Sequence, residues 1–519
     1  MSVFRYSVIP KFRYSEKIKK SNLQKTLMKY IIAIDQSTSA TKALLFDEQC
    51  RLLTRSSVAH QQYYPQAGWV EHDAEEIYRN TIQAIGLLLE GRELDPDNYT
   101  LAITNQRETI VAWDRQTGTP ICHALVWQDT RGAELCRQWR KVPGMEQLVE
   151  QHTGLKVDPN FCASKIRWIL DNVPGARSKA DAGELLVGTI DCWLVWKLTG
   201  GRTFATDYTN ASRTMVFDIY RLVWDEELLK ATGIPASVLP EPRSCDACYG
   251  ETMVEGLFER PIQIAGVLGD SHGALIGQMC FGAGTGKVTY GTGSSVMLNI
   301  GEEPRKAPEG LVTSIGFSIL GKTYYAYEGN IYSTGATLKW MADQMKLIGS
   351  PAETESIATS VESNGGVYLV PAFAGLGAPW WQDQVKAAIV GMTFNTTRAH
   401  IVRAAVESIA YQVTDLVKAM TATTDICIRE LSADGGPTGN RFLMQFQADL
   451  LDADIVCTDV EDASALGAVV VNGFARRVWT QPEEVSRLKN IIKRITPAST
   501  DKTSEVYAAW RKAVEHLIK

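Results

Sequence analysis

Short apolar runs alternate along the chain with longer stretches in which apolar residues recur every three or four positions. The short runs are typical of buried strands, and the longer stretches are typical of amphipathic helices. The strand-like runs are 30–34, 43–46, 101–103, 185–187, 262–267, 367–371 and 430–432, and the helical stretches include 75–89, 401–420 and 463–477. Because the two kinds of element alternate, the sequence predicts an α/β fold.

Residues 30–47 hold the most informative of these patterns. The run 30–34 ends at Asp35, and a turn rich in hydroxyl side chains leads into the run 43–46. If the two runs pair, their tight turn aims several backbone N–H groups at one point, which suits an anion such as phosphate. The carboxylate of Asp35 at the strand end could hold Mg²⁺, directly or through water. For this pattern alone, an ordinary surface hairpin is the alternative.

A related pattern returns at residues 287–301, where a β-rich segment meets the small-residue turn 291–295 and leaves through an apolar segment. A third glycine-rich element, 434–440, follows the strand-like segment 428–433 and precedes a helical run at 442–451. Glycines at such a point let a bulky ligand approach the backbone. Together, the three elements predict two similar lobes that close over one nucleotide.

Eight motifs in the same order make the chain similar to a known family. They are DQST (35–38), GWVEHD (68–73), TNQRET (104–109), VWQ (126–128), DYTNASR (207–213), YGTG (290–293), PAFAGLGAP (371–379) and FLMQFQ (442–447). From about Met28 to Lys519 the chain resembles the FGGY carbohydrate kinases of the sugar kinase–Hsp70–actin superfamily, and among them the glycerol kinases most nearly. The resemblance implies two ribonuclease-H-like lobes around a central cleft, ATP and Mg²⁺ as cofactors, and phosphorylation of a small polyol.

The resemblance also assigns the catalytic and substrate-binding residues. The family's catalytic carboxylate falls on Asp270, which follows the strand-like run 262–267. An Asp at a helix start is often only an N-cap, which is the alternative here. Arg107 and Glu108 are expected to bind polyol hydroxyls as donor and acceptor, and Trp127 is expected to line the polyol pocket.

Two positions depart from the glycerol kinase pattern in the substrate pocket. Asn160 stands where these enzymes typically have Tyr, and Ser271 stands where they have Gln. Both changes remove bulk and relocate hydrogen bonds, and a buried site penalises a substrate that leaves its polar groups unpaired. The acceptor therefore stays open between glycerol, with water filling the space, and a tetritol, dihydroxyacetone or a ketose of the xylulose or ribulose type.

For the nucleotide, the resemblance implies contacts from both hairpins and from the third glycine-rich element. The expected residues are Thr38, Ser39, Lys42, Thr292, Gly335, Lys339, Gly436 and Asn440. Lys42 stands where glycerol kinases commonly have Arg, so the charge is kept but the planar fork is lost. Lys339 stands where Gln is familiar, which could alter the contact with the base.

Chain length predicts the domain organisation. A chain of 519 residues is too long for one ordinary core and predicts at least two domains. We place the boundary near residues 274–284, where glycines and small residues cluster. This gives a substrate-binding N-terminal lobe, 30–276, and a nucleotide-binding C-terminal lobe, 277–519.

Composition and charge narrow the remaining possibilities. The net charge of −6 argues against a nucleic-acid surface. No apolar run reaches the roughly 18 residues that a membrane-spanning helix needs. The ten scattered cysteines fit reduced thiols in a cytoplasmic enzyme. The family is often dimeric or tetrameric, so a homodimer or homotetramer is expected.

Residues 1–29 differ from the rest of the chain. They carry eight Lys or Arg residues and one acidic residue, and the family resemblance begins only after them. We expect a disordered basic extension, or synthesis that starts at Met28. A targeting peptide is the alternative.

Overall fold

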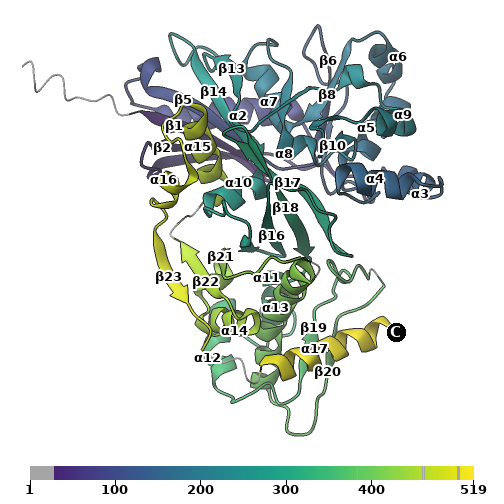
Figure 1. Cartoon of the computed structure of the whole chain (residues 1–519), viewed down its shortest axis with the longest axis vertical. Coiled ribbons are helices and arrows are strands. Elements are labelled where there is room, and N and C mark those ends of the chain that lie inside the picture. The colour runs from purple at the N-terminus through teal and green to yellow at the C-terminus, as the bar shows by residue number, and fades with distance from the viewer. Residues whose placement is uncertain (1–28, 383, 423, 459, 461, 499–502) are drawn as a thin grey trace, which may run out of the picture.

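The computed structural model describes residues 29–519, apart from 383, 423, 459, 461 and 499–502. Two mixed β-sheets organise this part of the chain (Figure 1). The first sheet, in the order β13-β14-β5-β1-β2-β3, consists of β1 (Tyr30–Gln36), β2 (Ala40–Asp47), β3 (Leu52–Ala59), β5 (Tyr99–Asn105), β13 (Cys248–Thr252) and β14 (Ile262–Gly269). The second, in the order β17-β18-β16-β15-β21-β22-β23, consists of β15 (Thr285–Tyr290), β16 (Ser294–Gly301), β17 (Val312–Ile319), β18 (Lys322–Ile331), β21 (Glu430–Asp434), β22 (Asp454–Thr458) and β23 (Ile491–Ile495).

The two sheets share one plan. In the first, β1, β2 and β3 pair antiparallel, and β5 and β14 continue parallel to β1. In the second, β15, β16 and β18 pair antiparallel, and β21 and β22 continue parallel to β15. This repeated arrangement is the ribonuclease-H-like plan, so the predicted α/β fold with two such lobes is confirmed.

The remaining elements extend and cover these sheets. A smaller sheet in the order β4-β7-β6-β8 has an apolar face that packs with α3–α6 and α9. The other strands are β4 (Glu71–His72), β6 (Ile110–Asp114), β7 (Ala124–Leu125), β8 (Leu185–Thr189), β9 (Ala205–Asp207), β10 (Phe217–Asp218), β11 (Val223–Trp224), β12 (Glu241–Arg243), β19 (Tyr368–Val370) and β20 (Ala388–Val390). The helices are α2 (Ala74–Leu89), α3 (Ala133–Arg140), α4 (Met145–Thr153), α5 (Cys162–Asn172), α6 (Ala176–Asp181), α7 (Ile190–Leu198), α8 (Tyr208–Ala211), α9 (Glu226–Thr232), α10 (Asp270–Gly277), α11 (Gly335–Asp343), α12 (Thr354–Thr359), α13 (Arg398–Thr421), α14 (Arg441–Leu451), α15 (Ala463–Ala475), α16 (Pro482–Ser486) and α17 (Thr503–Ile518). Short 3-10 helices are η1 (Pro96–Asn98), η2 (Ala236–Val238), η3 (Pro351–Glu353) and η4 (Gly436–Gly439).

Strand alternation gives the second sheet two different faces. On one face, Val288 and Val296 join the apolar core with residues of α13 and α14. On the opposite face, Lys287, Met297 and Glu328 lie in one row, because Lys287 pairs with Met297 and Met297 pairs with Glu328. Met297 packs there with residues of α10, α15 and the first sheet. The charged residues of this row therefore face the other lobe.

Helices α10 and α15 cross at very short distance. A Cβ atom added to Gly467 of α15 would lie 1.9 Å from the carbonyl oxygen of Gly273 in α10. The side chain of Asn472 in α15 donates hydrogen bonds to the backbone oxygens of Leu101 and Ala265, which belong to the first sheet. Although α15 comes late in the chain, it is therefore docked on the sheet that the N-terminal half builds.

The structure contains the elements that the sequence predicts. Both hairpins form, as β1–β2 and β15–β16, and the third glycine-rich element becomes η4 between β21 and α14. Gly269, not Asp270, is the N-cap of α10, so Asp270 is its first helical residue. The division near 274–284 stays a prediction. The expectation for residues 1–29 lies, except for Lys29, outside the described residues. Within the part of the chain that the structure describes, no helix is both long and apolar enough to span a membrane.

Candidate active site

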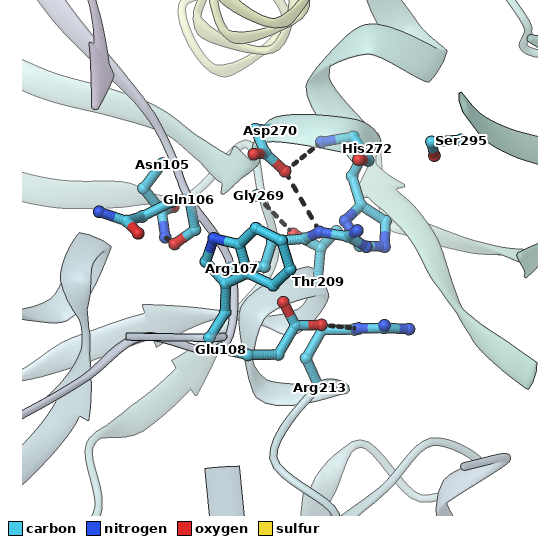
Figure 2. A network of polar contacts seen from close by, with 12 residues as sticks. Asn105, Gln106, Arg107, Glu108, Thr209, Arg213, Gly269, Asp270, His272 and Ser295 are labelled. Atoms are coloured by element: carbon cyan, nitrogen blue, oxygen red, sulfur yellow. Dashed lines mark hydrogen bonds and ion pairs between the residues drawn. The ribbon is translucent and has the colours of Figure 1, made fainter. Parts of the chain in front are cut away.

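Asp270 stands where β14 ends and α10 begins, facing the other charged residues of the site (Figure 2). Its Oδ1 atom accepts a hydrogen bond from the Ser271 backbone N–H at 2.6 Å and lies 3.2 Å from Nε of Arg107. About 36% of the side chain is exposed, so the carboxylate is open to a ligand. Burial by the surrounding protein nevertheless raises the pKa of Asp270, and Arg107 opposes this shift. A carboxylate held in this way can act as a general base.

Arg107 connects the two lobes. Its guanidinium donates two hydrogen bonds to the carboxylate of Glu328 on β18, at 2.9 and 2.7 Å, while its Nε atom faces Asp270. Such a two-fold contact fixes both position and orientation of the guanidinium. Arg213 also lies 2.9 Å from Glu328. Burial favours a higher pKa for Glu328, but the two arginines outweigh it and hold this pKa well below its usual range.

Glu108 is held on the other side of this cluster. Its Oε1 atom accepts a hydrogen bond from Nε of Arg213 at 2.5 Å. The backbone φ of Glu108 is +58°, in the left-handed region that side chains other than Gly and Asn rarely adopt. Backbone strain of this kind is concentrated at functional sites. Arg107 and Glu108 are each paired with a partner from elsewhere in the chain, and their contact with a polyol stays a prediction.

His272 is completely buried beside this cluster. Burial lowers the pKa of His272 well below its usual value, and the neighbouring arginine Arg107 acts in the same direction. The imidazole is therefore neutral. Its Nε2 atom is 3.5 Å from Oγ of Ser314, and its Nδ1 atom has no hydrogen-bond partner among the described residues.

The first hairpin carries a second set of charges. Asp35 lies at the end of β1 and is buried, and Lys42 on β2 is 3.5 Å from its Oδ2 atom. The Lys42 ammonium also contacts Asp462, the N-cap of α15, at 2.5 Å. Burial raises the pKa of Asp35 to about 6, against the pull of Lys42 and with added repulsion from Asp270 and Asp462. This excess of negative charge fits a divalent cation bound at Asp35.

The turn of the same hairpin contacts the predicted substrate wall. Nε1 of Trp127 donates a hydrogen bond to Oγ1 of Thr38 at 3.0 Å, and about 37% of the Trp127 side chain is exposed. A residue predicted to bind phosphate and a residue predicted to bind polyol are thus adjacent. Ser39 is exposed at the tip of the turn, where its carbonyl oxygen accepts a hydrogen bond from the backbone N–H of His60.

A cavity of about 540 Å³ lies beside the second hairpin. It is lined by Tyr290, Gly291, Thr292, Gly335, Ala336, Lys339, Trp340, Asp343, Gln344, Gly436 and Pro437. Four predicted nucleotide residues, Thr292, Gly335, Lys339 and Gly436, are among them. Asn440 is not: its side chain caps α14 through Leu443 and donates to Thr354. Both polar atoms of the Asn440 side chain thus have partners within the protein, and its predicted nucleotide contact stays a prediction.

Asn160 and Ser271, the two predicted specificity residues, lie just before α5 and in α10. Asn160 precedes α5, and its carbonyl oxygen accepts a hydrogen bond from the buried ammonium of Lys165 at 2.6 Å. Ser271 follows Asp270 in α10 and is half-buried. The hydrogen bonds of Asn160 and Ser271 among the described residues involve their backbone atoms. Both side chains are therefore available to contact a substrate.

Sequence reasoning missed three charged residues of the site: Arg213, Lys287 and Glu328. Arg213 lies inside the DYTNASR motif, which was a usable signal. Glu328 and Lys287 are single charges within β-rich runs. The sequence could have indicated them only as charged residues at alternating positions of a buried strand. That pattern does not show which residues they contact.

Family comparison bears directly on this site. Residues 30–277 match the N-terminal domain of the FGGY family of carbohydrate kinases, and residues 286–476 match its C-terminal domain. The chain belongs to this family. It is accordingly an ATP-dependent carbohydrate kinase, and the predicted enzyme class is confirmed.

Individual relatives agree with this assignment. The kinase is 48% identical over 491 residues to glycerol kinase 1 of Thermotoga maritima, covering 94% of this chain and 99% of the relative. It is 43% identical to a glycerol kinase of Bacillus anthracis, with the same coverage. Among solved structures, the glycerol kinase of Plasmodium falciparum with ADP has a TM-score of 0.88 and 36% identity, over 95% of this chain and 99% of that one. A xylulose kinase of Lactobacillus acidophilus, 19% identical over 95% of this chain and 99% of that one, shares the fold with a TM-score of 0.84.

Proposed function

We propose that this kinase transfers the γ-phosphoryl group of ATP to a terminal hydroxyl of glycerol and forms glycerol 3-phosphate. The observation that carries the proposal is the position of Asp270, a partly open carboxylate at the start of α10, 3.2 Å from Nε of Arg107 (Figure 2). The long similarity to several glycerol kinases supports glycerol as the acceptor.

In this proposal, the residues of the cluster have separate tasks. Asp270 accepts the proton of the acceptor hydroxyl, and its raised pKa makes the carboxylate a stronger base. Arg107 and Glu108 bind the other hydroxyls as donor and acceptor, and Trp127 covers the carbon chain. The ion pairs with Glu328 and Arg213 fix these side chains before the substrate arrives, which lowers the entropic cost of orientation.

The nucleotide and metal complete the site. We assign the adenosine to the cavity lined by Gly335, Lys339 and Gly436, and the phosphates to the hairpin residues Thr38 and Thr292. Asp35 is the residue that would hold Mg²⁺, which neutralises phosphate charge when bound. Replacement Asp35→Asn should raise the Mg²⁺ concentration needed for half-maximal velocity, and an unchanged requirement would remove Asp35 from this role.

A coupled ADP-release assay tests the reaction. The wild-type kinase should phosphorylate glycerol with Mg·ATP, and Asp270→Asn should lower kcat by about 10²- to 10⁴-fold, as loss of a general base does. The matched control is Asp97→Asn, because Asp97 pairs only with the surface residue Arg260. Full turnover by Asp270→Asn would contradict the mechanism.

A second candidate is a kinase for another small polyol or ketose. It is favoured by the small side chains at Asn160 and Ser271, where glycerol kinases typically have Tyr and Gln. Ranking glycerol, dihydroxyacetone, erythritol, threitol, xylulose and ribulose by kcat/KM separates the two candidates. If glycerol ranks low, Asn160→Tyr with Ser271→Gln should shift preference towards it.

Compartment and assembly also belong to the proposal. We infer a cytoplasmic enzyme, since all ten cysteines are free thiols in the structure. We propose a homodimer or homotetramer, because members of the family are often dimeric or tetrameric. Light scattering after size-exclusion chromatography measures the mass of the particle in solution. The mass of a single chain would contradict the proposed assembly.

A further inference from the structure

Lys287 is a buried cation that the tasks above do not use. It lies on β15, the strand that leads into the second hairpin, and only 1% of it is exposed. Its ammonium donates hydrogen bonds to Oγ1 of Thr289 and Oγ of Ser295, both at 3.2 Å. No carboxylate among the described residues forms an ion pair with it. Figure 2 draws Ser295 to the side of the charged cluster, beyond His272.

A lysine in this position is costly for the fold. Burying an ammonium without an ion partner loses hydration that two hydroxyl groups replace only in part. Burial accordingly lowers the pKa of Lys287 below its usual value. A methionine of similar length would pack here at lower cost, as Met297 does on the next strand. Residues that cost stability in this way are concentrated at functional sites.

The groups that face Lys287 are those of the active site. Several packed elements contribute them: Asp270, His272 and Cys280 from α10 and its end, Arg107 after β5, Glu328 from β18, and Asp434 from the end of β21. Glu328 is already compensated by Arg107 and Arg213. Among the carboxylates, Asp434 attracts the Lys287 ammonium most strongly, followed by Glu328 and Asp270. Its two hydrogen bonds go to Thr289 and Ser295, which lie on the two strands of the second hairpin.

We propose that Lys287 is a positioning residue for phosphoryl transfer: it fixes Thr289 and Ser295 beneath the second hairpin and places a positive charge where negative charge gathers between Asp270 and the phosphates. This inference rests on the proposed function. The ammonium does not touch the reacting atoms and acts through the hairpin and through the carboxylate of Asp270. Fixed charges of this kind stabilise a transition state without reorganising during the reaction.

The test compares Lys287→Met and Lys287→Gln with the wild type. Both variants remove the charge, and Gln keeps hydrogen bonding to the two hydroxyls. We expect kcat to fall about 10²-fold in both, with KM for glycerol changed less than about threefold. Lys322→Met is the control, because Lys322 pairs with the exposed Glu302 and with none of the groups around Lys287, and it should keep wild-type kcat.

Two further readouts exclude a merely structural role. Removing the positive charge should move the acidic limb of the kcat/KM profile to higher pH, because Lys287 helps to keep Asp270 ionised. The melting temperature of Lys287→Met should stay equal or rise. A lower melting temperature together with a higher KM for ATP would mark a structural residue and overturn the inference.

The outcomes separate this inference from the function on which it rests. If Lys287→Met keeps wild-type kcat and an unshifted pH profile, the inference is overturned and the proposed function stands. If the wild-type kinase phosphorylates neither glycerol nor the other acceptors, the proposed function itself fails.

Discussion

Glu328 shows how one side chain can order several others. Its carboxylate accepts two hydrogen bonds from Arg107 and lies 2.9 Å from Arg213, which in turn holds Glu108. It comes from the second sheet, whereas its partners come from the N-terminal half of the chain. This residue thus connects the geometry of the proposed acceptor site with the contact between lobes.

Replacing Glu328 by Gln should be strongly destabilising. Two buried guanidinium groups would lose their anionic partner, and breaking such a buried pair costs about 3–5 kcal/mol. Urea unfolding measures this loss, and KM for glycerol should rise as well. The control is Glu302→Gln, whose exposed pair with Lys322 should contribute less than about 1 kcal/mol. Equal effects of the two changes would contradict this account of Glu328.

The buried pair Asp191 and Asp207 predicts a pH dependence. Burial, and then the repulsion of Asp207, raises the pKa of Asp191 from 3.8 to about 7. Between these two values the folded state keeps a proton that the unfolded state has released, so stability falls as pH rises through this window. Asp191→Asn should therefore match the wild type near pH 4 and exceed it near pH 8 by about 4 kcal/mol in chemical unfolding. A constant difference at all pH values would be inconsistent with this pair.

At the scale of elements, the crossing of α10 and α15 needs glycine. Gly467 brings the backbones together without a side chain, and α15 also closes over the first sheet through Asn472. The apolar periodicity of residues 463–477 predicted this helix. It did not indicate which sheet the helix would cover, because periodicity defines a buried face but no partner.

Two glycine-to-alanine substitutions should change the stability of the fold in opposite directions. Gly467→Ala places a Cβ atom 1.9 Å from the Gly273 carbonyl oxygen and should cost about 1–3 kcal/mol or more as the helices separate. Gly86→Ala, in the interior of α2 with no heavy atom within 4 Å of the new Cβ, should gain about 0.5–1 kcal/mol. Thermal unfolding compares them, and a stabilising Gly467→Ala would show that the crossing is not tight.

At the scale of the whole molecule, the two similar sheets face each other across α10, α15 and the row of charged residues on β15 and β18. Most cysteines lie within this framework or in the core of the smaller sheet. Only Cys248 and Cys427 of the ten free cysteines are exposed. Cys50 and Cys122 are half-buried, and burial raises the pKa of each to about 12.

Thiol titration should report this burial. In the native kinase, a disulfide reagent should modify Cys248 and Cys427 rapidly and the other cysteines slowly, because buried thiols with a raised pKa form little thiolate. In guanidinium all ten should react. A double variant, Cys248→Ser with Cys427→Ser, should lose the rapid phase, and its persistence would place an additional thiol at the surface.

The sequence by itself predicted central strands, several main helices and the two hairpins, because apolar periodicity and turn chemistry extend over only a few residues each. The enzyme family followed from the resemblance of its ordered motifs. The motif at 104–109 carried Arg107 and Glu108, and the family resemblance assigned Asp270. Only the tertiary structure decided their partners. Arg107 meets Glu328 221 positions later in the chain, and Lys42 meets Asp462 420 positions later. Those pairs depend on how two separate sheets face each other, and no local pattern encodes that contact.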